Sequence, residues 1–430
     1  MKRNCSRKPK HTRKPKRISI IDYLPEDVLS QILSHLDHFD LKSTSLVCKL
    51  FCSLSSPLVR ELTLGNSSDF QGLFKRFPCV KNIGIDNFLN LDKALLAISN
   101  SDLNLEKLHL PLFEHPQYPE TPTIENMSMS SVIKGIKSLQ LCWFHGTAPK
   151  LQIVKFINLF PAITELYITN AHIWEDKLIH KVTLKLPDLQ KISLICYNID
   201  NDETLAILST NCPKLESVNF HGCWFSPEAL FEFFCNNPKL SSVCMPDFNS
   251  PSIYRVSVVE CMQVLKNLNH LSLKSDHLED AVLIRLAELR PPLRSLVIGR
   301  SFSQRYTMAG LSRLLPAYPS LESLDIHLPH RKRKNCKTHD AELSIIVKRL
   351  PNLKHITVWS RIVCQATLFS LIENCPLLET VLLMSYSHHS EVYCDQGMAR
   401  PIKKNYSIKL IAANIWLRLM VQSYCPNMWK

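Results

Sequence analysis

Histidine and cysteine are the side chains of this sequence best suited to hold a metal ion, but their spacing does not favour a site. Cys336 lies near His339, and His388-His389 lies near Cys394, yet neither group contains a paired CxxC or HxxxH motif. Serines, carboxylates and histidines are abundant, and no spacing sets a nucleophile beside a base. With 9 glycines among 430 residues, the chain also contains no GxGxxG, GxxxxGKS/T or GxSxG motif. We expect no catalytic residue, no metal and no cofactor, so the chain is predicted to act by binding.

Two short segments carry the excess of positive charge, which is +13 for the whole chain. Residues 2–17 contain nine Lys or Arg and no acid, and residues 331–337 contain five more. The remaining 37 basic residues balance 38 acidic ones, so the body of the chain is neutral.

The basic tail, residues 2–17, has three interpretations. Its two clusters have the spacing of a bipartite nuclear-import signal, which leads us to expect a protein of the nucleus, the cytoplasm or both. The tail also suits non-specific contact with phosphate backbones, although nucleic acid is the less favoured partner. Like charges and two prolines equally fit a solvated, disordered leader over residues 1–19. The residues of the import hypothesis are Lys2, Arg3, Arg13, Lys14, Lys16 and Arg17.

The sixteen cysteines are scattered too evenly for a disulfide framework. No hydrophobic signal segment precedes them, which favours reduced thiols in a cytosolic or nuclear protein. No run of eighteen apolar residues occurs, so we expect no membrane span. A content of 45% hydrophobic and 21% charged residues is that of a globular chain able to bury a large core.

The stretch from Leu24 to Leu54 predicts three short helices. Pro25 suits a first helical turn, and the two acids that follow it favour the positive end of a helix. Apolar residues then recur at helical spacing and form one wide face of the first helix. Asp40 is expected to cap the second helix, and Cys48–Leu54 to belong to the third. Three short helices bury little surface alone, so the unit needs a neighbour, and a spare apolar face would dock a partner.

This stretch resembles an F-box. The motifs that carry the resemblance are Leu24-Pro25-Glu26-Asp27, Ile32-Leu33, Leu36, Asp40-Leu41 and Leu46-Val47-Cys48-Lys49. It departs from the family at Leu50, where many members have a basic residue, and at Phe51, where many have Trp. The resemblance implies binding to the small adaptor subunit of SCF-type (cullin–RING) ubiquitin ligases and, through it, to the cullin and RING subunits. The matching positions, which pack the helices or meet the adaptor, are Leu24, Pro25, Ile32, Leu33, Leu36, Leu41 and Val47.

From about residue 59, a unit of the form apolar-x-x-apolar-x-apolar recurs thirteen times. From residue 80 onward, successive units start 25 to 32 residues apart. The last two apolar residues of a unit lie two positions apart, so on a strand both point into a core. Helical patches between the units, such as Glu203–Leu208 and Ala281–Leu286, cover that core once copies stack. The units start at Val59, Val80, Leu105, Ile136, Ile163, Leu189, Leu215, Leu240, Leu268, Leu293, Leu321, Leu353 and Leu378.

This period is typical of leucine-rich repeats. The Asn-Cys-Pro triplets at 211–213 and 374–376 resemble cysteine-containing repeats that commonly follow an F-box, which implies cysteines buried in the turn before a strand. We therefore expect an α/β fold with a three-helix F-box at residues 20–58. A solenoid of leucine-rich repeats should follow at 59–400, with a parallel sheet on its concave face and helices on its convex face. Residues 401–430 should cap it, with a helix at Lys409–Tyr424.

The concave sheet is the expected binding face for an unknown protein substrate, because strand residues that flank the inward pair point to that side. Trp359 is the expected anchor, since an exposed large ring on a concave wall favours a covering partner. Two insertions, Pro111–Ser130 and Pro329–Asp340, follow strands and should leave the same rim. The second insertion adds Arg331 and Arg333, which would attract an acidic or phosphorylated segment. The concave candidates are Glu165, Tyr167, Asn219, His221, His270, Lys274, Asp325, His327, His355 and Trp359.

Two functions fit these expectations. The first is the substrate-recognition subunit of an SCF-type ubiquitin ligase, a non-catalytic receptor. The second is a non-catalytic nuclear scaffold whose repeats bind protein or ribonucleoprotein, and whose F-box does not act through ubiquitin. Adaptor binding that depends on the first F-box helix distinguishes them.

Overall fold

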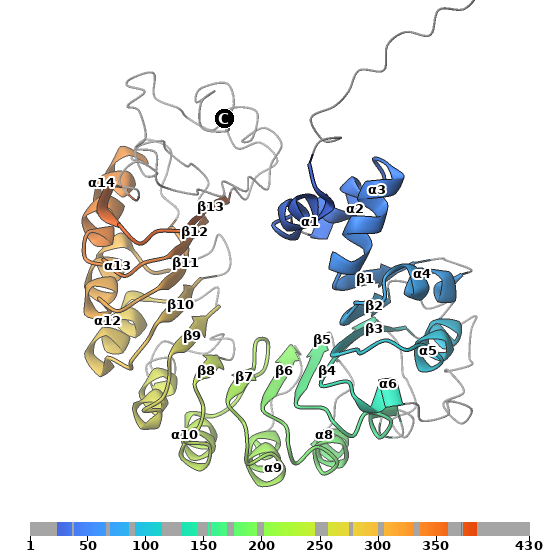
Figure 1. Ribbon diagram of the computed structural model, residues 1–430. Coiled ribbons are helices and arrows are strands. Elements are labelled where there is room, and N and C mark those ends of the chain that lie inside the picture. The colour runs from blue at the N-terminus through green and yellow to red at the C-terminus, as the bar shows by residue number, and fades with distance from the viewer. Residues whose placement is uncertain are drawn as a thin grey trace, which may run out of the picture.

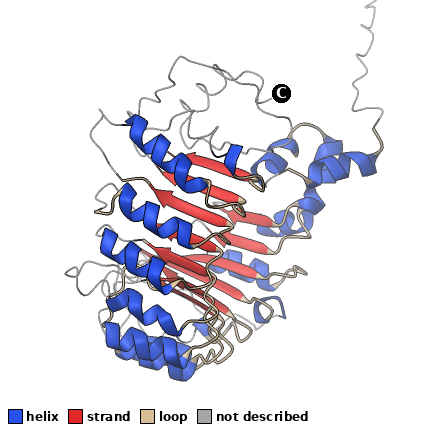
Figure 2. Cartoon of the chain, turned by 90° about the vertical axis from the view of Figure 1, so that its left-hand side faces the viewer, coloured by secondary structure: helices blue, strands red, loops and turns tan. Residues whose placement is uncertain are grey.

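The repeats build one curved sheet in the computed structural model, which describes residues 24–36, 38–65, 69–85, 91–113, 131–144, 154, 156–169, 176–195, 202–245, 257–274, 278–299, 305–329, 336–359, 371 and 373–384. Thirteen parallel strands in these ranges follow one another in chain order and line the inside of an arc, with helices outside (Figure 1). Seen from the side, the strands stack as successive rungs under the helices (Figure 2). No described helix is both long and apolar enough to cross a membrane.

Three helices precede the sheet, as expected: α1 (Glu26–Ser34), α2 (His38–Thr44) and α3 (Lys49–Ser55). α1 begins directly after Pro25, and α3 is capped by Cys48, whose Sγ accepts a hydrogen bond from the Phe51 N–H at 3.4 Å. The predicted cap at Asp40 is wrong, because α2 already begins at His38 and Asp40 lies in its first turn. An acid in that turn still favours the helix through its dipole.

Every predicted repeat unit supplies one strand. Register is kept from strand to strand, so that Leu62 pairs with Ile83, and Ile83 with Leu108, in one inward-facing column. The strands are β1 (Glu61–Leu64), β2 (Asn82–Ile85), β3 (Lys107–Phe113), β4 (Ser138–Phe144), β5 (Glu165–Thr169), β6 (Lys191–Ile195), β7 (Ser217–Asn219), β8 (Ser242–Cys244), β9 (His270–Leu273), β10 (Ser295–Ile298), β11 (Ser323–His327), β12 (His355–Trp359) and β13 (Thr380–Met384).

Short helices cover the outer side of the sheet and close the core over the inward columns. The two helical patches expected from the sequence fall within α9 and α12. The outer helices are α4 (Phe70–Arg76), α5 (Leu91–Ser99), α6 (Ser131–Lys134), α8 (Asp176–Thr183), α9 (Glu203–Asn211), α10 (Pro227–Asn236), η5 (Cys261–Val264), α12 (Asp280–Leu289), α13 (Met308–Leu314), η6 (Leu315–Ala317) and α14 (Cys336–Val347).

The cysteines of the two Asn-Cys-Pro triplets are fully buried in the turns before β7 and β13, as expected. The Cys212 thiol donates to the Leu186 carbonyl, and the Cys375 thiol to the Val347 carbonyl, each at 3.8 Å. Burial raises the pKa of Cys212 to about 12 and that of Cys375 to about 11, so both thiols stay protonated near neutral pH. They tie each turn to the preceding repeat.

Both expected insertions are shorter than the sequence indicated. β3 continues through Pro111 to Phe113, which pairs with Phe144, so the first insertion is reduced to residues 114–130, outside the described residues. Pro111 is tolerated because β2 pairs with β3 only as far as His109, beyond which that side needs no N–H donor. The second insertion shrinks to 330–335, because α14 begins at Cys336.

Candidate functional site

The three-helix unit exposes apolar side chains that its own core does not need. α1 divides its wide apolar face in two: Leu29 and Leu33 are buried, whereas Val28 and Ile32, one turn apart, are 39% and 50% exposed. In the turn before α3, Leu46 is 81% and Val47 68% exposed. Large apolar side chains gathered on so small a unit are a common sign of a protein interface.

The seven family positions chosen from the sequence therefore have different roles. Leu33 and Leu41 are buried and hold the helices together, while Leu24 and Leu36 are partly buried. The exposed positions are Pro25, Ile32 and Val47. The sequence reasoning left Val28 and Leu46 out of this set, although the spacing of one and the motif of the other pointed to them.

The three-helix unit is attached to the solenoid without a linker. α3 continues through η2 (Ser56–Leu58) into β1, and the Ser56 hydroxyl donates to the Cys52 carbonyl at 2.6 Å inside this joint. Arg60 reaches the Pro57 and Cys79 carbonyls, and the Arg76 guanidinium donates to the Cys52 Sγ at 3.1 Å. These contacts fix the unit to the first repeat.

Several of the predicted concave residues are engaged with neighbouring strands. The Lys191 ammonium contacts Glu165 at 2.7 Å, the Tyr167 hydroxyl donates to the same carboxylate at 3.3 Å, and His270 Nδ1 lies 2.8 Å from the Ser295 hydroxyl. His355 makes a similar contact with Thr380. The contacts of Glu165, His270 and His355 each join one strand to the next, whereas Tyr167 and Glu165 lie on the same strand.

Two opposing influences set the pKa of the Glu165 carboxyl. Burial raises the pKa of its carboxyl, but the hydrogen bond and charge of Lys191, with Ser138 and Lys107, outweigh burial and leave that pKa below its usual value. Glu165 therefore stays ionised at neutral pH and holds Lys191 beside Tyr167.

Four predicted residues come together at the β9–β12 end of the concave face, and we call Lys274, Asp325, His327 and Trp359 the β9–β12 cluster. His327 pairs with Trp359 across β11 and β12, and their rings stack with centroids 5.1 Å apart at 21°. Asp325 lies two residues before His327 and so points to the same face. Gly299 follows Ile298, which pairs with both Leu273 and Ile326, so no side chain separates Lys274 from His327.

Electrostatics in the β9–β12 cluster follow from burial. His327 is only 7% exposed, and burial, with the charge of Lys274, lowers its pKa to about 4. Burial raises the pKa of Asp325, although the Trp359 indole and Lys274 lower it. Lys274 is exposed and makes no hydrogen bond or ion pair with a described residue. The cluster thus combines the exposed Lys274 side chain with the buried His327 ring, which is neutral at neutral pH, and with the Asp325 carboxyl.

Strand alternation predicted that the side chains of His221 and His327 are exposed, and the structure shows that both are buried. His327 is buried beneath the Trp359 stack, while the buried Tyr306 hydroxyl donates to its carbonyl. His221 is 7% exposed and lies beyond β7, in a turn where Gly222 has φ 83°. β7 lies two strands before β9, so neither His221 nor Asn219 belongs to the β9–β12 cluster. No sequence signal indicated Tyr306.

Other predicted residues lie outside the described part of the chain. These are the basic tail, Arg331, Arg333, the segment 385–430 with its expected cap, and the His388-His389 pair with Cys394. Among the residues that the structure describes, no three His, Cys, Asp or Glu side chains gather as metal ligands.

Comparisons with known proteins agree with this architecture. A family model described as F-box-like matches residues 21–64. F-box/LRR-repeat protein 4 of Bos taurus is 24% identical over 200 residues, which is 44% of this chain and 30% of that protein. The match thus spans less than a third of this relative's length.

Two solved structures are among the matches to this chain. The leucine-rich repeat-containing protein LegL7 of Legionella pneumophila has a TM-score of 0.46 and 14% identity, covering 64% of this chain and 90% of that one. A chain of the Rad7 and Elc1 complex of yeast has a TM-score of 0.43 and 15% identity, covering 92% of each chain. The chain thus carries an F-box-like segment at residues 21–64, followed by thirteen parallel strands that are built from one leucine-rich period.

Proposed function

We propose that this chain is the substrate-recognition subunit of an SCF-type (cullin–RING) E3 ubiquitin ligase and performs no chemistry itself. Its F-box-like unit binds the small adaptor subunit, which brings the cullin and RING subunits, and its concave face binds the protein to be ubiquitylated. The observation that carries the proposal is the exposure of Val28, Ile32, Leu46 and Val47 on the F-box-like unit.

Burial of these side chains against a partner is favourable by the hydrophobic effect. Fully covering a Val, Leu or Ile side chain contributes about 1.5–3 kcal/mol, so covering even part of four gives an adaptor interface a substantial apolar centre. The buried pair Leu29 and Leu33 keeps α1 folded while its other side docks.

The stiff joint between α3 and β1 supports the receptor role. A ligase must hold its substrate at a set distance from the site of ubiquitin transfer, and positioning of reactants is a large part of rate enhancement. Because Arg60 bridges the Pro57 and Cys79 carbonyls and Arg76 contacts Cys52, a protein bound on the concave face stays in a fixed place relative to the adaptor.

The test is capture of the adaptor and cullin by tagged full-length chain carrying Ile32→Asp. Ile32 is half exposed, so the variant should fold, but docking would then bury an unpaired carboxylate, which costs several kcal/mol. We expect adaptor capture to be lost. Leu184→Asp, at an apolar side chain 54% exposed on the solenoid, is the matched control and should capture normally. Undiminished capture by Ile32→Asp would contradict the proposal and favour a scaffold that does not act through ubiquitin.

A second readout of the same experiment addresses the concave face. Lys274→Glu reverses an exposed charge of the β9–β12 cluster, and Trp359→Leu removes its largest ring. Both variants should keep the adaptor while losing ubiquitylated clients in proteomic capture, because a central aromatic anchor commonly dominates binding energy. If both variants captured the same ubiquitylated clients as the unaltered chain, substrate recognition would not depend on this cluster.

A further inference from the structure

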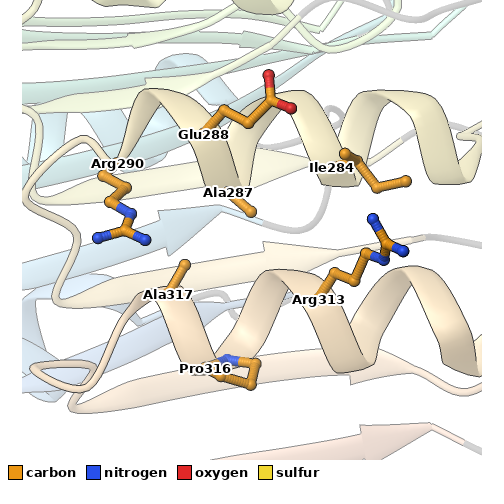
Figure 3. Close-up of a pocket in the computed structure, with 7 residues that line it drawn as sticks. All are labelled: Ile284, Ala287, Glu288, Arg290, Arg313, Pro316 and Ala317. Carbon is orange, nitrogen blue, oxygen red and sulfur yellow. The ribbon is translucent and has the colours of Figure 1, made fainter.

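The convex side carries an open groove of about 710 Å³ between α12 and the α13–η6 segment (Figure 3). Ala287 and Ala317 face each other across its middle, and their short side chains leave the space between the helices unfilled. Arg290 and Arg313 stand at its opposite ends. The groove therefore combines an apolar floor with a guanidinium at each end.

Several basic side chains elsewhere in the solenoid meet an acid from the neighbouring repeat. The preceding helical contact has Arg285 on Glu260 at 3.0 Å, and the next loop has Arg305 on Glu279 at 3.5 Å. On the strand side, Lys191 meets Glu165 at 2.7 Å. Such matching removes like-charge repulsion between stacked repeats.

The groove departs from this pattern. Arg290 and Arg313 are exposed and make no hydrogen bond or ion pair with any residue that the structure describes. Glu288 also lines the groove, but its carboxylate is held by Arg285 at 2.8 Å and turns away from Ala287 (Figure 3). Two cations thus remain unmatched over an apolar floor.

Arg290 is also held in an unfavourable backbone conformation. It has φ 46° at the end of α12, the one positive φ at a non-glycine residue in the described ranges. Helices that end this way usually place glycine there, because a side chain in this conformation is sterically strained. The strained position sends the Arg290 side chain over the groove, and strain of this kind is common at binding sites.

We propose that this groove binds an acidic peptide segment of a partner protein, with carboxylates on Arg290 and Arg313 and small apolar residues on Ala287 and Ala317. Two separated guanidinium groups with an apolar stretch between them fit two carboxylates on one segment. Nucleic acid fits less well, since it needs a longer cationic track or aromatic rings for stacking, and neither lines this groove. The site lies on the convex face and is independent of adaptor binding.

The test measures fluorescence polarisation of a fluorescein-labelled peptide of four Glu-Ala-Ala repeats, titrated with the full chain at low ionic strength. A peptide of four Gln-Ala-Ala repeats should bind more weakly. Arg290→Glu and Arg313→Glu should each weaken binding about fivefold, as expected for loss of one exposed ion pair. The double variant should instead prefer a peptide of four Lys-Ala-Ala repeats.

The matched control is Arg349→Glu, which reverses an exposed and equally unpaired arginine outside the groove. It should bind the acidic peptide as the unaltered chain does. Equal weakening by Arg349→Glu would overturn the proposal, because attraction would then come from overall charge. Unchanged binding by the double variant would overturn it too, as would tighter, Arg290- and Arg313-dependent binding of a twelve-nucleotide single-stranded DNA. Adaptor capture by each variant reports folding separately.

Discussion

At the scale of single residues, burial decides which side chains of the concave face carry charge. Burial under Trp359 lowers the pKa of His327 to about 4, so its ring is neutral at neutral pH, whereas Lys274 is exposed on the same face. The pKa of His270 is lowered for the same reasons as that of His327, namely burial and the charge of Lys274. Strand alternation places all these residues on one face, but only packing sets their protonation.

The protonation of His327 predicts a loss of stability in acid. Its folded pKa of about 4 lies below the usual value of about 6.5, so the unfolded chain binds the proton first. The contribution is therefore complete above about pH 6.5 and is lost as pH falls toward 4. We expect His327→Phe, which keeps a ring beneath Trp359, to reduce this acid-induced loss by on the order of 2 kcal/mol.

The measurement compares denaturant unfolding of both proteins between pH 7.5 and 4. Asp325 opposes the trend only at the acid end, because its raised pKa lets the folded chain take up that proton early. The difference between the two proteins isolates His327 from His270 and Asp325. If the free energy of unfolding of the two proteins fell equally with pH, the His327 imidazole would have to remain hydrated in the folded chain.

At the scale of elements, the ends of the outer helices differ in how closely they follow the usual capping rules. α10 has a regular start, with Ser226 accepting from the Ala229 N–H at 3.1 Å and Pro227 in its first turn. α12 ends irregularly at Arg290, where glycine would be the low-energy choice. We propose that arginine is kept at this position because its side chain lines the convex groove.

Arg290→Gly should stabilise the solenoid while removing one cation from the groove. Glycine adopts φ 46° without steric cost, and this gain exceeds the greater freedom of glycine in the unfolded chain, so we expect about 0.5–1 kcal/mol of added stability. Thermal unfolding followed by circular dichroism measures it. Arg313→Gly, which lies in regular α13, is the control and should destabilise. A lower midpoint for Arg290→Gly would mean that the arginine stabilises the helix end more than its conformation costs.

At the scale of the whole molecule, the F-box-like unit and the concave sheet lie on one arc (Figure 1). Stacked repeats share nearest-neighbour contacts, so binding on one face leaves the other face unchanged. We propose a nuclear or cytoplasmic location for the protein, with the basic tail acting as a nuclear-import signal.

Deleting residues 2–17 should move a fluorescent fusion from the nucleus to the cytoplasm, because import receptors read the two basic clusters together. The fraction of nuclear fluorescence in living cells is the measurement. Replacing Lys14, Lys16 and Arg17 by Gln removes one cluster at constant length and should give the same shift. An unchanged distribution in both variants would leave the tail as a solvated leader or a phosphate-binding segment.

The sequence by itself determined the features that depend on short-range periodicity. The recurrence of one apolar unit predicted all thirteen strands, and the resemblance to cysteine-containing repeats predicted the two buried cysteines of the Asn-Cys-Pro turns. Only the tertiary structure decided how α1 divides its apolar face between Leu29 and Ile32, because both lie on the same wide stripe of the helix. It also decided the burial of His327 and the unmatched charges of Arg290 and Arg313. These features depend on contacts between residues that lie far apart in the sequence, and local spacing carries no information about such contacts.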